Sequence, residues 1–417
     1  MRELIDQLDN AAWKELLLGI LAAKDDATPL IDQLAAMLRR GRVEDRFGRI
    51  SARDAARLIQ IGMLTKFPPH PFSEWYANSE LLFWFVTLRH PVLARAVFER
   101  YAQCPEPLKP YALTIVAAQP DEGAVKILEE IVAGFGLPTE MLPRFFWELS
   151  RNIDHYARVL PLLVTRADKR IPYVVNLVNE ALEKGLLCSA DLLPAADEIR
   201  AQTRALLDIV VPAQRNDGVQ WRYEGEYSDA ASRLGPWIDL YGHLPCDEDV
   251  LRELYKLTDS YLLGCLISTL LKWNREPDAE VIRAVARDPI QRIGLLSVLK
   301  GRPDLYPPEY RTFERFAESD MATWIRNDCG TEAESLELVG VYRAQGDDGA
   351  ESFACLWRFR MEGDEFAGVS GPYGSREATE PVWGEGTFSR FDPWASKSPE
   401  EHIRAISDNL SAWRACH

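Results

Sequence analysis

The sequence predicts a mainly α architecture, in which an α-solenoid of helical hairpins is followed by a small antiparallel β-sheet module capped by a C-terminal helix. Up to about residue 330, apolar residues recur at spacings of three and four in segments of about 12 to 18 residues, which is typical of amphipathic helices. The links between these segments are short, so successive helices are expected to pack antiparallel. After Thr331 the helical period gives way to strand-like alternation.

The first three quarters of the chain contain the segments with the clearest helical period. Proline stands at or near the first helical position in several of them, where its fixed φ suits the helix and its missing amide hydrogen is not needed. In order, the expected helices are Leu4–Ala23, Thr28–Arg40, Ser51–Leu64, Ser79–Leu88, Pro91–Gln103, Pro107–Ala118, Asp121–Gly134, Pro138–Ser150, Ile171–Lys184, Ser189–Val211, Asp247–Leu257, Ser260–Trp273, Pro277–Ala286, Pro289–Lys300 and Pro307–Glu318.

Repetition is clearest between Ser260 and Ser319, where a proline or aspartate marks each turn and apolar residues share one face. A helical hairpin cannot bury both of its faces alone, so stacked hairpins would share a continuous core. This stretch resembles HEAT-like repeats, and the resemblance extends to about half of the chain. It implies an array that binds other proteins and does not imply a particular activity.

The helical period is interrupted between Val211 and Arg233. This break divides an N-terminal helical array, residues 1–214, from a second block of HEAT-like hairpins, residues 215–330. The break is interpreted as a long loop that carries Trp221, Tyr223 and Tyr227 among charged residues. Loops on rigid scaffolds often hold binding residues, so these three aromatic side chains are candidate contacts with a protein partner.

The last predicted domain is a small α+β module, residues 331–417. Strands are expected at Ser335–Ala344, Ser352–Met361 and Glu365–Ser370, joined by the turn sequences GDDGA and EGD, with a further strand around Thr387–Phe391. Ser398 and Glu401 have the spacing of a capping box, and Pro399 occupies the first helical position. The helix that starts there is expected to cover one face of the sheet.

Negative charge is concentrated in this module. Acidic residues outnumber basic ones by two to one from Thr331 to His417, within a chain of net charge −16. Asp347, Asp348, Asp364 and Glu365 fall at the expected hairpin turns, where they would be exposed. The sequence therefore predicts a basic protein partner that is attracted to this module.

Composition also argues against several classes of function. The net charge of −16 is unfavourable for binding duplex nucleic acid or an anionic membrane surface. Acidic residues precede the first apolar run, unlike in a secretory signal peptide, and no apolar stretch is long enough to span a bilayer. The seven cysteines are dispersed and no histidines have metal-ligand spacing, which favours a cytoplasmic protein with reduced thiols, no metal and no cofactor.

Three local patterns have a catalytic or binding interpretation beside a structural one. Gly368 to Gly371 approaches the nucleophile elbow of hydrolases, but Pro372 replaces the second glycine, which favours an ordinary strand end. Glu148 and His155 would share a helix face if the helix continued past Ser150, and so form an acid and base pair. The aromatic residues between Phe67 and Phe85 are expected to fill a core, with an exposed contact patch as the alternative.

Two functional hypotheses follow from the sequence. The first is a non-catalytic protein-binding scaffold, in a specific form an immunity-type inhibitor that covers a basic partner. The second is an enzyme with a pocket inside the helical array.

Overall fold

The computed structural model describes residues 52–64, 73–86, 89–166, 172–214, 225–345, 351–373 and 391–405. The chain separates into two compact units, Met1–Ile199 and Arg200–His417. The sequence had predicted three domains, with boundaries after residues 214 and 330. In the structure the second helical block and the sheet belong to one unit.

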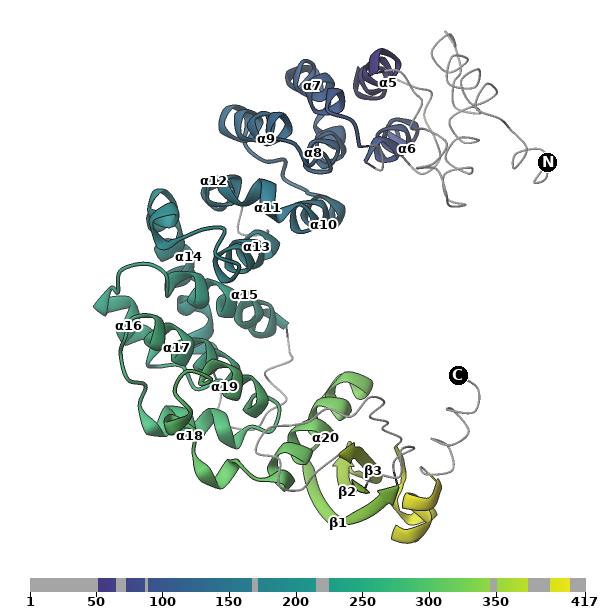
Figure 1. Cartoon of the computed structure of the whole chain (residues 1–417), viewed down its shortest axis with the longest axis vertical. Helices are drawn as coiled ribbons and strands as arrows, with labels where there is room; N and C mark the ends of the chain where they lie inside the picture. The colour runs from purple at the N-terminus through teal and green to yellow at the C-terminus, as the bar shows by residue number, and fades with distance from the viewer. Residues whose placement is uncertain are drawn as a thin grey trace, which may run out of the picture. The chain divides into compact units, whose positions relative to one another are not determined.

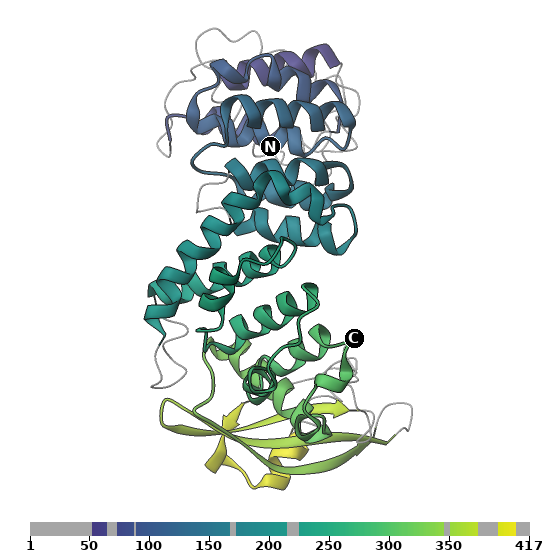
Figure 2. The same ribbon diagram turned by 90° about the vertical axis from the view of Figure 1, so that its left-hand side faces the viewer.

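The first unit consists of short helices in two layers. One layer contains α5 (Ala52–Leu64), α7 (Val92–Phe98), α9 (Glu122–Phe135) and α12 (Leu160–Arg166). The other contains α6 (Tyr76–Phe85), α8 (Lys109–Ala117), α10 (Pro143–Arg151) and α13 (Pro172–Glu183), with the short α11 (Ile153–Tyr156) between α10 and α12. Figure 1 shows the two layers nearly end-on, and Figure 2 shows the same helices from the side.

Each helix of the first unit contacts both its sequence neighbour and the next helix of its own layer. Thus α6 contacts α8, α8 contacts α10, and α10 contacts α13, while α5, α7 and α9 contact one another in the same order. The core between the layers is apolar, with fully buried residues such as Leu113, Leu128 and Leu149. This arrangement agrees with the expected hairpins, and each helix buries apolar surface that it could not bury alone.

The second unit begins within α14 (Ala196–Ala213) and continues with α15 (Gly225–Tyr241), α16 (Glu248–Leu254), α17 (Ser260–Lys272), α18 (Ala279–Arg287), α19 (Arg292–Val298) and α20 (Phe313–Cys329). Aspartates cap three of these helices. Asp247, Asp259 and Asp278 each accept hydrogen bonds from the amides that begin α16, α17 and α18. Such caps satisfy donors that have no partner within the helix, so the local sequence itself sets the helix starts.

The sheet contains β1 (Ser335–Gln345), β2 (Glu351–Met361), β3 (Asp364–Tyr373) and the short β4 (Asp392–Pro393), in the order β1-β2-β3-β4 and antiparallel throughout. The first three strands confirm the sequence prediction to within a few residues. The fourth lies just after the range predicted for it. Register shifts near Gly340 and between Phe353 and Cys355 interrupt the pairing.

Both faces of the sheet are covered by helical residues. On one face, α20 packs Phe313, Met321 and Ile325 against Trp357 and Phe359, as its position beside the strands in Figure 1 illustrates. On the other face, Ile403 of the helical residues 399–405 packs against Leu356 and Val369. The described part of the predicted capping helix, residues 399–405, therefore packs on one face as expected, and the residues from 406 on lie outside the described part of the chain.

The helix on the first face differs from its prediction. Sequence periodicity placed a repeat helix at Pro307–Glu318, but Pro308–Tyr310 forms a 3-10 turn and α20 runs from Phe313 to Cys329. Pro308 disfavours the α conformation in the residue before it, and Pro307 is accordingly extended with a ψ of 123°, so a helix cannot begin at 307. Thr312 caps α20, which continues past the predicted helix end at Glu318 and stops just before the sheet module predicted from residue 331.

None of the helices within the described residues is long and apolar enough to cross a membrane.

Candidate functional site

The first unit contains a carboxylate that is completely buried and paired with two arginines. Glu148 of α10 has no exposed surface. Its Oε1 accepts from Arg144 Nε at 2.8 Å, and its Oε2 accepts from Arg89 Nη2 at 2.9 Å. Both arginines are about one third exposed, at 34% and 31%. A buried carboxylate is costly unless charged donors compensate it, so this pair of contacts fixes two guanidinium groups at the surface.

An exposed tryptophan of α10 lies beside Arg144 and a third arginine, Arg151. Trp147 is 47% exposed. The Arg144 guanidinium carbon lies 3.8 Å from the centroid of its ring, and that of Arg151 lies 5.4 Å away. The spacing of 144, 147 and 151 places all three on one helix face. A tryptophan ring with two guanidinium groups close to it presents both apolar surface and positive charge to a binding partner.

Two other helices of the same layer expose aromatic side chains. Phe83 of α6 is 45% exposed, and Tyr173 of α13 is 55% exposed. The Tyr173 ring stacks on Phe146 of α10, with centroids 5.3 Å apart. We call the exposed side chains Phe83, Trp147 and Tyr173 the aromatic face. Aromatic residues of this kind, with large area and few rotatable bonds, are typical of interface anchors.

The C-terminal end of α10, which carries Trp147, and the following helix α11 are both hydrogen-bonded to α8. The Tyr156 hydroxyl lies 2.7 Å from the carbonyl oxygen of Val116, and Asn152 Nδ2 donates to the carbonyl oxygen of Ala117 at 3.1 Å. Burial raises the pKa of Tyr156 far above its usual range, so its hydroxyl stays protonated. These contacts keep the surface residues of α10 in a fixed position.

The second unit contains a polar pocket of about 230 Å³. Two acids, an arginine and several hydroxyls line it, and the described lining includes no histidine, cysteine or lysine. The lining residues are Ser228, Ala231, Ser232, Asp259, Ser260, Tyr261, Gln291, Arg326 and Glu332. Asp259 is occupied structurally, since it accepts from the Tyr261 and Leu262 amides and from the Tyr227 hydroxyl.

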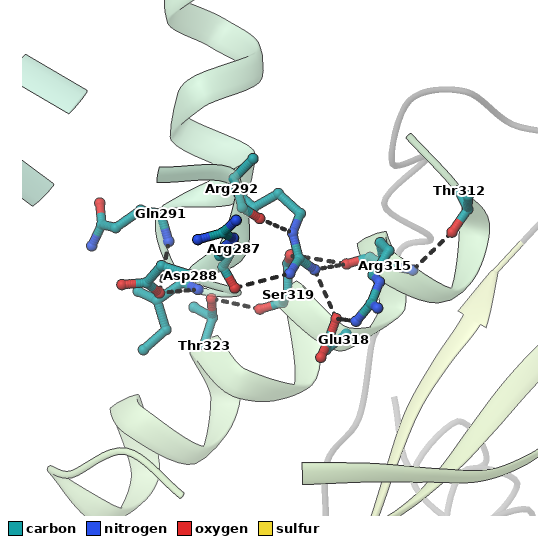
Figure 3. A network of polar contacts seen from close by, with 11 residues as sticks. Arg287, Asp288, Gln291, Arg292, Thr312, Arg315, Glu318, Ser319 and Thr323 are labelled. Carbon is teal, nitrogen blue, oxygen red and sulfur yellow. Dashed lines mark hydrogen bonds and ion pairs between the residues drawn. The ribbon is translucent and has the colours of Figure 1, made fainter. Parts of the chain in front are cut away.

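Close to this pocket a buried arginine joins three helices of the second unit. Arg292 is 1% exposed, and its guanidinium donates to the carbonyl oxygens of Ala286 and Arg315 at 2.7 and 2.6 Å. It also donates to Glu318 Oε2 at 2.9 Å and lies over the Tyr310 ring. Figure 3 shows the contacts of Arg292 with Arg287, Arg315, Glu318 and Ser319. Every partner is internal, which indicates a structural role.

The structure places the predicted loop residues differently from their interpretation. Trp221 and Tyr223 lie outside the described residues. Tyr227 belongs to α15, is only 7% exposed, and donates its hydroxyl to Asp259 Oδ2 at 3.2 Å. Its side chain fills the unit interior, so it does not offer the exposed contact that the sequence suggested.

The four acidic residues predicted to form an exposed cluster have different environments. Asp347 and Asp348 lie outside the described residues. Asp364 is exposed at the turn between β2 and β3. Glu365 instead forms ion pairs with Arg358 and Arg360, and the hydrogen bond from Arg358 is the main cause that lowers its pKa. Among the described members, only Asp364 therefore matches the expectation of an exposed, uncompensated charge.

The catalytic interpretations do not fit the geometry. Glu148 is fully engaged by arginines, whereas His155 lies on the exposed side of α11, beyond the end of α10. Ser370 is 2% exposed, and its hydroxyl accepts from Trp357 Nε1 at 2.9 Å, as a residue within a strand. Among the described residues, no group of three or more His, Cys, Asp or Glu side chains is arranged to hold a metal ion.

Trp147 and its neighbouring arginines were not among the site residues predicted from the sequence. The spacing of Arg144, Trp147, Glu148 and Arg151 could have indicated a shared surface. Only the structure shows that Glu148 faces inward while Trp147 faces solvent. Comparison with known proteins adds no further assignment, because no protein-family model, no curated protein and no solved structure matches this chain.

Proposed function

We propose that this protein is a non-catalytic, cytoplasmic protein-binding scaffold whose first unit holds a partner against the aromatic face. The observation that carries the proposal is the exposure of Phe83, Trp147 and Tyr173 on helices of one layer. Large aromatic side chains fixed on a rigid support are the residues that most often dominate binding energy at interfaces. None of the six described cysteines forms a disulfide bond, which supports a reducing compartment.

The net charge supports a partner of opposite sign. At −16, the chain would attract a basic protein over several ångströms before contact, and it would repel nucleic acid and anionic membranes. A specific form of the proposal is an immunity-type inhibitor, in which this scaffold covers the working surface of a basic toxin.

The pocket of the second unit supports a binding role better than a catalytic one. Its best-placed acid, Asp259, already accepts three hydrogen bonds, and its Ser260 hydroxyl donates to Asp288. General acid and base catalysis requires a group that is free to exchange a proton with substrate. None of the described lining residues combines a free nucleophile with a neighbouring base.

The proposal is tested by capture of the partner with matched variants. Affinity-tagged protein is purified from the cells that produce it, and its stoichiometric partner is identified and then produced in recombinant form. We expect Trp147→Ala with Tyr173→Ala to weaken binding of the purified partner by at least about tenfold, as for interface anchors. Phe135→Ala is the matched control, because Phe135 is 52% exposed but lies at the end of α9 in the other layer.

Two results would contradict the proposal. One is equal binding by the double variant and the wild type. The other is a saturable turnover of a small substrate by the purified protein that disappears when the second-unit pocket is altered at Arg326.

A further inference from the structure

The guanidinium groups around Trp147 identify the chemistry of the surface that the partner must present. Arg89, Arg144 and Arg151 bring three positive charges to this part of the first unit, and Glu148 supplies one negative charge between the first two. The Arg151 guanidinium lies near the Trp147 ring and pairs with no carboxylate among the described residues. The cluster therefore carries a local excess of positive charge within a chain of net charge −16.

The buried Glu148 carboxylate restricts the conformation of the arginines that it contacts. A surface arginine without a partner samples many rotamers and loses that freedom when it binds. Here Arg144 Nε and Nη2 lie 2.8 and 2.7 Å from Glu148 Oε1. The guanidinium of Arg144 also packs over the Trp147 ring, which further restricts it. The guanidinium is thus positioned before any ligand arrives. The Arg144 side chain as a whole is 34% exposed, so the guanidinium can still be reached from solvent.

We infer that this surface, formed by Arg89, Arg144, Trp147 and Arg151, binds an acidic segment of the protein partner. The inference rests on the proposed scaffold function and specifies the contact. Guanidinium groups match carboxylates in geometry as well as charge, and a tryptophan between them accepts an apolar side chain of the same segment. A partner with positive net charge can still present such a segment, because local contacts act within about 8 Å at physiological salt.

The helix geometry predicts the spacing of the acidic residues. Arg144 and Arg151 are seven positions apart on α10, which corresponds to about 10 Å along a helix axis. An extended chain covers that distance in about three residues. The expected ligand is therefore an extended segment with two carboxylates about three residues apart and an apolar residue between them.

A protein segment is favoured over single-stranded nucleic acid, which arginines and aromatic rings also bind. Nucleic acid brings a charge at every nucleotide, and the net charge of −16 would oppose such a polyanion. A peptide with two carboxylates carries two negative charges, which the arginines of this surface can neutralise.

The test uses fluorescein-labelled dodecapeptides and fluorescence anisotropy with the full chain. One peptide carries two glutamates three residues apart with a phenylalanine between them. The others replace both glutamates by glutamine or by lysine, and oligo(U) of matching length is included. We expect the acidic peptide to bind at least about tenfold more tightly than the glutamine peptide, and this preference to shrink as salt is raised from 50 to 300 mM, roughly as charge screening requires.

Variants assign the binding to the arginine surface. Arg151→Glu should weaken the acidic peptide by about tenfold or more, as reversal of one of a few contacting charges does. Arg151 does not contact Glu148, so the buried pair stays intact. Arg95→Glu is the matched control, since Arg95 is an exposed arginine over the Phe98 ring at 5.6 Å on α7 of the other layer. It should change binding by less than about twofold.

The outcomes separate this inference from the scaffold proposal. Equal binding of the acidic and glutamine peptides, no acidic-peptide binding up to 1 mM, or tighter binding of oligo(U) would overturn the inference. If the captured partner requires Trp147 and Tyr173 but ignores Arg151→Glu, the scaffold proposal stands and the acidic-segment inference falls. If the partner ignores all three side chains, the aromatic face itself is not the binding surface.

Discussion

Two glycines of the sheet adopt positive φ angles for different reasons. Gly363 has a φ of +85°, and a Cβ added there would meet nothing within 4 Å. Gly371 has a φ of +112°, and its added Cβ would lie 2.7 Å from the Phe353 carbonyl oxygen, next to the register shift between β2 and β3. A side chain at position 363 would cause backbone strain alone, because of the positive φ. A side chain at position 371 would cause the same strain and would also clash with the backbone of Phe353.

The two alanine substitutions are therefore expected to differ. Gly363→Ala should lower the free energy of unfolding by about 1 kcal/mol, and Gly371→Ala by about 3 kcal/mol. Urea denaturation followed by circular dichroism measures both. Equal losses would show that the approach of Phe353 has no energetic consequence.

His243 is expected to make the second unit sensitive to acid. Burial, reinforced by the nearby Lys272 cation, lowers the pKa of His243 to about 4. The unfolded chain has a histidine pKa near 6.5, so between pH 6.5 and 4 it binds more protons than the folded protein. Stability should therefore fall as the pH drops through this window, by about 1 to 2 kcal/mol because the ring is only partly shielded from water.

His243→Gln removes this titration and should flatten the pH profile of stability between pH 6.5 and 4. Thermal unfolding at a series of pH values provides the comparison. His155→Gln serves as the control, since His155 is exposed. A profile that is unchanged by His243→Gln would assign the acid sensitivity to other groups.

The environment of single residues explains why the candidate surface could not be predicted from the sequence. Arg144, Trp147 and Arg151 have recognisable helical spacing, but so do many solvated helix faces. The decisive fact is that Glu148 is fully buried, and it depends on the packing of α10 against the rest of its unit. Tyr227 illustrates the opposite error, because its charged neighbours suggested a loop although its ring packs inside the unit.

At the scale of elements, Arg292 connects α19 to α20 and so to the helix that covers the sheet. Arg292→Met should destabilise the protein by about 3 to 5 kcal/mol, because Glu318 and several carbonyl oxygens would lose a buried charged donor. Arg302→Met is the control, since Arg302 is 45% exposed and, among the residues that the structure describes, forms an ion pair with Asp304 alone. It should cost less than about 1 kcal/mol. Chemical denaturation of both variants makes the comparison, and similar losses would exclude a special role for the network of Figure 3.

The C-terminal helix shows which elements local sequence could predict. The Glu401 amide donates to Ser398 Oγ at 3.3 Å, and the Ser398 amide donates to Glu401 Oε2 at 2.8 Å, as the capping-box spacing predicted. Strands with alternating side chains were predicted well for the same reason, since their signals are local. The covering of the sheet by α20 was not predicted, because it depends on residues such as Phe313 and Trp357 that are distant in sequence.

Ser398→Ala should remove one half of the capping box and lower the free energy of unfolding by about 1 kcal/mol. Glu401→Gln keeps an acceptor at the other half and should cost less. Hydrogen exchange of the amides in residues 399–405 gives a local readout of the same loss. Unchanged exchange in Ser398→Ala would mean that packing alone maintains the helix start.

At the scale of the whole molecule, the net charge of −16 predicts how fast a basic partner is found. The association rate should fall severalfold between low and physiological salt, while dissociation changes less. Asp364→Lys, with Asp347→Lys and Asp348→Lys, should reproduce that loss at low salt. Glu365 is left unchanged, because its ion pairs with Arg358 and Arg360 stabilise the sheet surface. Stopped-flow mixing with the identified partner measures the rates, and a rate that ignores both salt and these reversals would contradict electrostatic steering.

The two-layered order of the first unit has a consequence for folding and evolution. Each described helix there contacts helices close to it in sequence, as α6 does with α8 and α10 with α13. Chains dominated by such short-range contacts close small loops and fold quickly, without waiting for distant segments to meet. Damage to one hairpin is then confined to its neighbours. A lineage could duplicate or delete a hairpin in this unit, and so change the length of this helical array, without altering the apolar core of the remaining hairpins.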